Sequence, residues 1–275
     1  MKWFKSLSEP MKIAFITGIF AIIAAIVGSV IAGIFALTST QANRTPSQIT
    51  NSPIVTAQTP ITSTTVPQRT VPPTLVPSPT PIPNPYPPYT GRLVLNDPLE
   101  DNSRGYMWDE VSTTYGNCNF QQDSTYHVFS IPNYYHRCAA EKTGFSDFTF
   151  EVTLTIVRGY CGGMIFRADA QSLSYYYFAI CQNGTYNFAI YTTGSEKLIQ
   201  NAVSNSNIHT GLLQTNLIAV VAINNSISLY VNNNSQAIYT TSESNFSQGQ
   251  IGLVAESDGS DPTDVSFSNA HVWAS

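Results

Sequence analysis

The chain has 275 residues, a formal net charge of −5 and an apolar content of 43%. The charge is concentrated in residues 94–275, which contain 6 Lys and Arg against 16 Asp and Glu, a formal charge of −10. An acidic region without a basic stripe argues against nucleic acid as a partner. It also argues against docking on anionic lipid, because like charges repel.

The N-terminal part of the chain contains an uncharged apolar run, Ile13–Leu37. A helix of this length reaches roughly 37 Å, enough to cross a hydrocarbon core of about 30 Å. Three lysines precede the run and the next cation is Arg44; the lysines are Lys2, Lys5 and Lys12. The positive-inside rule therefore predicts a cytoplasmic segment at residues 1–12 and an extracellular remainder.

A cleaved signal peptide is the alternative interpretation of this run. Signal-peptide cores span about 7–15 apolar residues, so the run is too long for one. The cleavage-like sequence Thr40-Gln41-Ala42 is also a poor match. We therefore predict a single-pass cell-membrane protein with an uncleaved anchor at residues 13–37. Small residues repeat every four positions in it and could let two helices dimerise: Ala21, Ala25, Ser29 and Gly33.

Residues 38–93 have the composition of a spacer. They hold 13 of the 17 prolines, many Ser and Thr, and three charged residues, all of them Arg. Such a segment cannot bury enough apolar surface to offset the entropy of ordering it. We expect a disordered Pro/Thr/Ser-rich linker between the anchor and a domain at 94–275, with an upper reach of roughly 170 Å.

The domain shows the two-residue alternation of β-strands. Phe148, Phe150 and Val152 alternate with Thr149, Glu151 and Thr153, and turn signals recur every 8 to 12 residues or so. Nothing after Leu37 shows a convincing helical period. The pattern predicts an all-β fold with two antiparallel sheets packed face to face.

One hairpin can be registered residue by residue. If its turn is centred on Gln171, Cys161 lies opposite Cys181, Met164 opposite Phe178, and Phe166 opposite Tyr176. The even-numbered residues of the two strands, such as Met164 and Phe178, then face the core. The opposite face carries Ile165, Arg167, Tyr175 and Tyr177.

The following turn tests this register. A two-residue Asn183-Gly184 loop would point Tyr186, Phe188 and Ile190 away from the core. A three-residue loop over 182–184, with a bulge at Gly184, returns them to it.

The four cysteines allow three disulfide pairings. The hairpin register places Cys161 beside Cys181, which leaves Cys118 to pair with Cys138. An extracellular location favours such bonds. Zinc binding by Cys138 and His136 is the alternative, but no Cys-x-x-Cys or paired His spacing supports it.

Several segments resemble the concanavalin A-like lectin/glucanase (LamG-like) jelly rolls, a superfamily that also holds a bacterial 3-keto-disaccharide hydrolase group. The similar segments are Cys161–Asp169, Tyr175–Ile180, Asn216–Ala222, Ile227–Asn232, Gly249–Val254 and Val265–Asn269, with Asp97-Pro-Leu and Trp108 at the opening. The resemblance implies a jelly-roll sandwich. It implies little about activity, because the superfamily contains lectins, adhesion modules and glucanases.

The glucanases of this superfamily take their paired carboxylates from one strand, as Glu-x-Asp-x-x-Glu or Glu-x-Asp-x-Glu. Neither pattern occurs in this sequence, and Glu151, Asp169 and Glu256 are isolated from one another. A Gly-x-Ser-x-Gly nucleophile elbow is also absent. We therefore predict a domain that is not an enzyme.

The predicted ligand-binding surface is the outer face of the registered hairpin. Arg167, Tyr175 and Tyr177 lie on adjacent strands, and Asn187 follows the bulged turn. Aromatic rings stack on sugar C–H faces while planar donors hold hydroxyl groups. Acidic residues also cluster near both ends of the domain, at 97–101 and at 256–264. If the first and last strands pair, these clusters approach each other and could bind calcium, with Asp97 and Asp264 as ligands.

These observations predict a membrane-anchored extracellular domain that binds glycan without catalysis. The alternatives are an adhesion or sensing domain that binds a cell-surface protein, and a glycoside-processing enzyme with an atypical site.

Overall fold

The computed structural model describes residues 82–274. The predicted cytoplasmic segment, the anchor at 13–37 and spacer residues 38–81 lie outside this range, so the anchor and its dimerisation stay predictions. Within the described range, no helix has the length and apolar content that a bilayer crossing requires.

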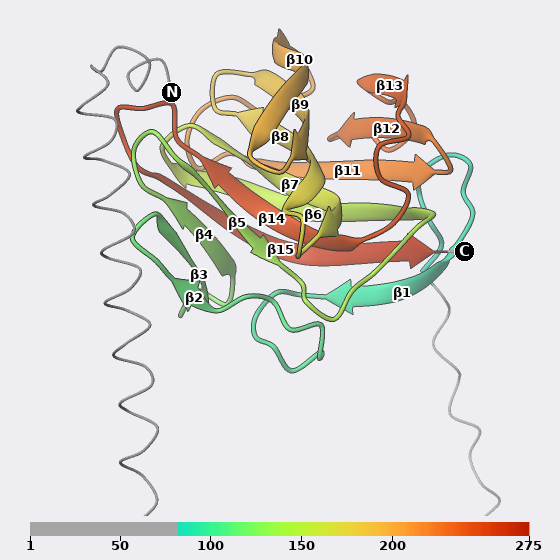
Figure 1. The fold of residues 1–275 in the computed structure, drawn as a ribbon, viewed down its shortest axis with the longest axis horizontal. Helices are drawn as coiled ribbons and strands as arrows, with labels where there is room; N and C mark the ends of the chain where they lie inside the picture. Colours follow the sequence, from blue (N-terminus) through green and yellow to red (C-terminus); the bar gives the residue numbers. More distant parts are fainter. Residues whose placement is uncertain (1–81, 275) are drawn as a thin grey trace, which may run out of the picture. The chain divides into compact units, whose positions relative to one another are not determined.

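The described residues form two antiparallel sheets (Figure 1). The nine-stranded sheet contains, in spatial order, β13 (Tyr239–Ser242), β12 (Ser226–Val231), β11 (Thr215–Ile223), β6 (Phe148–Arg158), β15 (Thr263–Ala274), β4 (Tyr126–Ser130), β3 (Gly116–Phe120) and β2 (Val111–Ser112), and β1 (Arg92–Asp97) also pairs with β15. The six-stranded sheet contains β10 (Ser195–Ser204), β9 (Thr185–Thr192), β8 (Ser174–Cys181), β7 (Cys161–Asp169), β14 (Gln250–Glu256) and β5 (Tyr135–Ala139).

The main core lies between the sheets and is built by alternation. On β6, Phe148, Phe150, Val152 and Leu154 are buried in it, whereas Glu151 and Thr153 between them are partly exposed. Both sheets send such rows inward, which removes apolar surface from water at roughly 25 cal/mol per Å². The predicted two-sheet antiparallel sandwich is therefore confirmed.

The predicted hairpin register is confirmed at each pair. Cys161 faces Cys181, Met164 faces Phe178 and Phe166 faces Tyr176. The next turn has the three-residue form, because Ile180 pairs with Tyr186 and Gly184 adopts a φ of 85°. Hydrophobic patterning therefore set the register of β7, β8 and β9.

The domain begins earlier than predicted. Residues 82–91, assigned above to the spacer, pack on the outer side of the nine-stranded sheet. Tyr86 is buried against Tyr230, with ring centroids 5.0 Å apart. The indole of Trp273 donates a hydrogen bond to the carbonyl of Ile82 at 3.0 Å. The predicted domain boundary at residue 94 is therefore wrong, because the tyrosine and asparagine of this proline-rich end have partners on the sheet.

Two disulfides are present, as predicted. Cys118–Cys138 joins β3 of the nine-stranded sheet to β5 of the six-stranded sheet, and Cys161–Cys181 joins neighbouring strands of one sheet. Both close loops with a sequence separation of 20. Loop-closure entropy alone therefore predicts equal stabilisation from the two bonds.

Replacing either pair, in C118A/C138A or in C161A/C181A, should lower the free energy of unfolding by about 3 kcal/mol. Urea unfolding followed by tryptophan fluorescence measures this value. The two variants serve as controls for each other, because their loops have equal length. A loss below about 1 kcal/mol in either variant would contradict loop closure as the main contribution.

Candidate functional site

The outer face of the six-stranded sheet carries a pocket of about 460 Å³. Side chains from five of the six strands and from the neighbouring loops line it: Asn133, Tyr134, Tyr135, Arg137, Leu173, Tyr175, Tyr191, Gly194, Glu196, Glu256 and Ser257. Its walls combine tyrosine rings, one guanidinium group and two carboxylates. It is therefore a candidate binding site.

Tyrosines from distant strands meet in this pocket. The ring of Tyr191 on β9 stacks on Tyr175 of β8 at 4.9 Å and contacts Tyr135 of β5 at 5.1 Å. The strands β8, β7 and β14 separate β9 from β5. Four strand spacings in a flat sheet would place these strands roughly 19 Å apart. The contact therefore requires the sheet to be concave on this face.

The tyrosines differ in what they offer a ligand. Tyr175 lines the pocket and is 1% exposed, so it belongs to the floor, and Tyr177, which is 3% exposed, reaches the pocket only through its hydrogen bond to Glu256. In contrast, Tyr135 is 37% exposed. The hydroxyl of Tyr175 donates to that of Tyr135 at 2.9 Å. The free ring surface therefore comes from Tyr135 and the half-buried Tyr191.

Arg137 supplies the cation of the pocket. Its guanidinium lies over the Tyr175 ring, 5.4 Å from the centroid. A cation in this position is held by the ring quadrupole and keeps its N–H groups free to donate.

Glu256 is the most perturbed acid of the pocket. Burial, and then the negative charge of Glu196, raise the pKa of its carboxyl group. The buried hydroxyl of Tyr177 donates a hydrogen bond to its Oε2 atom. Burial, followed by the charge of Glu256, raises the pKa of Tyr177 well above 10, so this phenol stays a donor.

Glu196 lies on β10 directly opposite Tyr191 and is exposed at the pocket wall. The pocket thus holds one shielded carboxyl group and one solvated carboxylate. Two acids in such different environments can take different roles in one site, one as an acid and one as a base.

Arg167 does not belong to this pocket, although the sequence placed it there. A bulge after Phe166, with a φ of 48° at Arg167, breaks the alternation. The side chain is 1% exposed, and its Nη2 and Nη1 atoms donate to the carbonyls of Ser146 at 2.7 Å and Phe246 at 3.1 Å. Arg167 therefore ties two loops to the end of β7.

Asn187 is buried and does not line the pocket. Its Oδ1 atom accepts a hydrogen bond from the Ala202 amide at 2.8 Å, which holds the irregular part of β10. A hydrogen bond from its side chain to Glu256 partly offsets the rise in the pKa of that acid. Of the four predicted ligand residues, the structure brings together Tyr175, Tyr177 and Asn187, largely beneath the exposed surface.

The two predicted calcium ligands do not meet. Asp97 on β1 pairs with Ala270, whereas Asp264 lies at the far end of β15, about 20 Å away along the strand. Asp97 accepts hydrogen bonds from the indole of Trp108 at 3.0 Å and the Leu99 amide at 2.9 Å. Asp264 contacts the ring of His127 at 2.9 Å. The first and last strands do pair, but in a register that separates the two acids.

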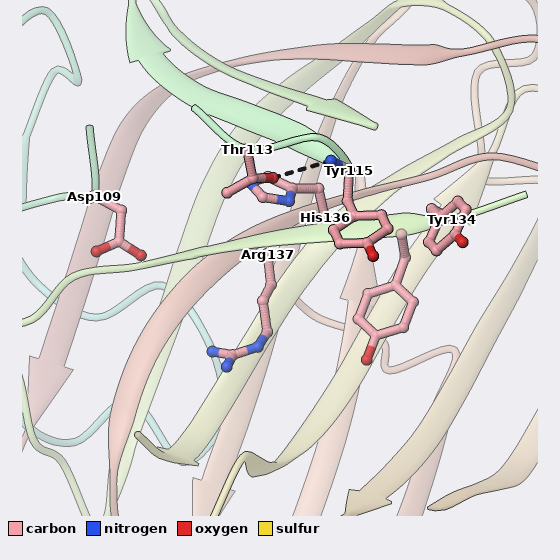
Figure 2. A pocket seen from close by; sticks show the side chains of 7 residues that line it. Asp109, Thr113, Tyr115, Tyr134, His136 and Arg137 are labelled. Atoms are coloured by element: carbon pink, nitrogen blue, oxygen red, sulfur yellow. Dashed lines mark hydrogen bonds between the residues drawn. The ribbon is translucent and has the colours of Figure 1, made fainter. Parts of the chain in front are cut away.

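A second pocket, of about 440 Å³, adjoins the first at the edge strand β5 (Figure 2). It is lined by Asp109, Thr113, Tyr115, Tyr134, Tyr135, His136 and Arg137. The two pockets share three of these residues, all on or next to β5.

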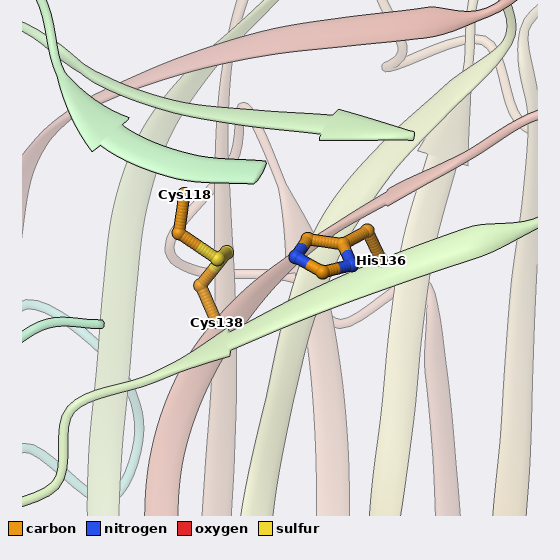
Figure 3. Close-up of side chains that lie close together, drawn as sticks. All are labelled: Cys118, His136 and Cys138. Atoms are coloured by element: carbon orange, nitrogen blue, oxygen red, sulfur yellow. A yellow bond between two sulfur atoms is a disulfide. The ribbon is translucent and has the colours of Figure 1, made fainter. Parts of the chain in front are cut away.

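Cys118, His136 and Cys138 offer ligand atoms within 4.8 Å of one another, and Figure 3 shows the imidazole beside the disulfide. Both sulfurs are bonded to each other, so neither is a free thiolate that could hold zinc. Burial lowers the pKa of His136, and its buried Nε2 atom has no hydrogen-bond partner. The predicted disulfide, not the zinc alternative, describes this group.

Comparison with solved structures identifies the fold. A Bacillus subtilis protein with a galectin-like fold aligns with a TM-score of 0.50 and 10% identity, over 66% of this chain and 96% of that one. The carbohydrate-binding module CBM66 from Bacillus subtilis aligns with a TM-score of 0.49 and 20% identity, over 61% and 95%. The catalytic domain of an endo-1,3-β-glucanase (laminarinase) from Thermotoga petrophila gives 0.46 and 7%, over 67% and 98%. The domain thus shares a galectin-like fold, in agreement with the jelly-roll sandwich that the resemblance implied.

No family model matches the sequence, and no curated protein is significantly similar to it. The similar structures correct one prediction. We predicted that the domain is not an enzyme, yet these structures include a glucanase catalytic domain.

The structural role of Arg167 can be separated from binding. Arg167→Ala should lower the free energy of unfolding by roughly 3 kcal/mol, because it leaves buried carbonyls without a donor. Chemical denaturation measures the loss, and the exposed Arg104→Ala is the matched control. Unchanged stability together with lost ligand binding would contradict this assignment.

Proposed function

We propose that residues 82–274 bind carbohydrate in the concave pocket of the six-stranded sheet. The observation that carries this proposal is the combination of the Tyr135 and Tyr191 rings with Arg137 and Glu196 as hydrogen-bonding groups in one pocket. Apolar ring faces beside a few placed polar groups are the general pattern of small-ligand sites.

The chemistry of the pocket suits a sugar in particular. A pyranose presents C–H groups on its faces and hydroxyls around its rim. The Tyr135 and Tyr191 rings can cover a face, while the guanidinium of Arg137 and the carboxylate of Glu196 can bind rim hydroxyls as donor and acceptor. The tyrosine floor is held by its own hydrogen bonds, so binding needs little reordering.

The protein is proposed to present this domain outside the cell, on the linker and the anchor at residues 13–37. This part of the proposal rests on the apolar run and its flanking lysines. Two disulfides in the domain are consistent with an oxidising exterior.

A glycan array probed with the full-length protein, in a detergent without a sugar headgroup, tests binding. We expect retention of at least one glycan, and about tenfold weaker binding in Tyr135→Ala and in Arg137→Ala, because each removes a contact of roughly 1.4 kcal/mol. Arg158→Ala is the matched control, since Arg158 also lies over an aromatic ring, that of Phe129, outside the pocket.

The proposal fails if no glycan is retained, or if both pocket variants bind as well as the wild type. Retention of a cell-surface protein in place of any glycan would support the adhesion alternative.

A second candidate function is glycoside hydrolysis in the same pocket. It is favoured by the pair of acids, Glu256 with a raised pKa and Glu196 in solvent. A neutral Glu256 can protonate the glycosidic oxygen as that bond breaks. The Glu196 carboxylate can take the proton of the attacking water or bond to the sugar carbon directly. Glucanases on this fold take both acids from one strand, whereas Glu196 and Glu256 lie on two strands, β10 and β14.

Turnover of a glycan retained on the array tests this candidate. Glu256→Gln should lower the rate at least about 100-fold and leave binding nearly unchanged, because the amide keeps the acceptor for Tyr177 but has no acidic proton. Activity should fall as the pH rises through the pKa of Glu256, since only the protonated form acts as the acid. Chromatography of the products measures the rate, with Glu243→Gln, at a partly exposed site outside both pockets, as the control. Absence of products from every retained glycan would eliminate hydrolysis and leave binding intact.

A further inference from the structure

We infer that the ligand is a linear, neutral oligosaccharide that leaves the concave pocket, crosses the edge strand β5 and lies on a second aromatic platform formed by Tyr115 and Tyr134. This inference rests on the proposed carbohydrate binding and extends it to the length and charge of the ligand.

The platform consists of two exposed rings in contact. Tyr115 is 52% exposed and Tyr134 is 46% exposed, and their centroids are 4.9 Å apart with an interplanar angle of 38°. Figure 2 shows both rings at the mouth of the second pocket. Large aromatic side chains gain from burial, so two of them adjoining a pocket point to a contact surface.

The turn that carries Tyr115 is fixed in place. Thr113 Oγ1 accepts hydrogen bonds from the amides of Tyr115 at 3.1 Å and Gly116 at 3.2 Å. A Cβ at Gly116 would lie 2.5 Å from Cγ of His136 and 2.1 Å from the carbonyl oxygen of Phe129. Glycine therefore lets the turn approach β5 closely enough for Tyr115 to reach Tyr134. The platform is preformed, which lowers the entropic cost of binding.

The two pockets form one surface. Tyr134, Tyr135 and Arg137 line both of them. Tyr135 contacts Tyr191 inside the concave pocket, and Tyr134, its neighbour in sequence, contacts Tyr115 outside it. A chain of sugars can therefore pass from one set of rings to the other across β5 without losing ring contact.

The charges of this surface favour a neutral chain. The two pockets together hold the acids Asp109, Glu196 and Glu256 against the single arginine, Arg137, among the residues that line them. An anionic polysaccharide would meet net repulsion, whereas a neutral one can use the same carboxylates as acceptors for its hydroxyls.

A length series tests the inference. Affinities of the full-length protein are measured by calorimetry for neutral oligosaccharides, from the disaccharide to the octasaccharide, prepared from the glycan retained on the array. We expect affinity to rise at least about tenfold once the chain is long enough to reach the platform. Tyr115→Ala, which removes a ring that lines only the second pocket, should abolish this rise and leave the affinity of the shortest binding oligosaccharide unchanged.

Tyr89→Ala is the matched control, because this tyrosine is 62% exposed and lines neither pocket. Equal affinity for short and long chains, or a Tyr115→Ala variant that still binds long chains tightly, overturns the platform while the proposed function stands. Tighter binding of a uronic-acid polymer than of a neutral one overturns the charge argument. Thermal unfolding of each variant confirms that the fold is retained; if Tyr115→Ala is unfolded, Tyr115→Leu is measured in its place.

Discussion

The curvature of the six-stranded sheet is the constraint on which the candidate site depends. Strands β5 and β9 lie at or next to opposite edges of the sheet, yet Tyr135 and Tyr191 touch. A flat sheet would separate them by roughly 19 Å. The inner rows of the same strands are packed against the other sheet, and this packing leaves the outer rows to converge. Alternate side chains of the same strands therefore form the core on one face of the sheet and the pocket on the other.

The tyrosines that meet on the outer face of the sheet also raise the pKa of Glu256 by burying its carboxyl group. Because the tyrosines cover the floor, the carboxyl group of Glu256 loses contact with water and keeps its proton to higher pH. The Tyr177 hydroxyl compensates by donating to it, and the Glu196 charge acts in the opposite sense. A buried acid on a stable sheet costs free energy, and a binding or catalytic role is the usual reason that a fold retains one.

Local pattern was sufficient to predict the register of neighbouring strands, and insufficient for the register and order of most strands that are distant in sequence. The register of β7 and β8 and the bulged turn before β9 follow from which residues must be buried, so Met164 and Phe178 could be paired from the sequence. The same reasoning placed Arg167 on the outer face, because a bulge at a strand end leaves no mark in the alternation of side chains.

Tyr135, Arg137 and Glu196 were missed for a different reason. Tyr135 and Arg137 reach the hairpin only through the order of strands in the sheet, where β14 inserts between β7 and β5, and a single sequence does not encode that order locally. Glu196 lies on β10, which pairs with β9, one strand beyond the hairpin whose register was predicted. The run Tyr134-Tyr-His-Arg137, dense in aromatic and basic residues, was the one available signal. The prediction that Asp97 and Asp264 approach each other was wrong for a similar reason. The two strands that carry them were identified, but the offset between these strands depends on the pairing of the whole sheet.

The disulfide Cys118–Cys138 connects these observations. As the edge strand of its sheet, β5 pairs with one strand, β14, and beyond that pairing Asp109 hydrogen-bonds to Ala139 at its end. Edge strands with one partner fray most easily, yet this one carries Tyr135 and Arg137 and follows Tyr134 directly. Cys138 is adjacent to Arg137, and Cys118 lies two residues after Gly116, at the base of the turn that holds Tyr115. One covalent bond between the sheets therefore anchors both sides of the surface that the two pockets share. Its contribution to binding is to keep the aromatic rings in position before the ligand arrives, which is a separate effect from its contribution to the stability of the sandwich.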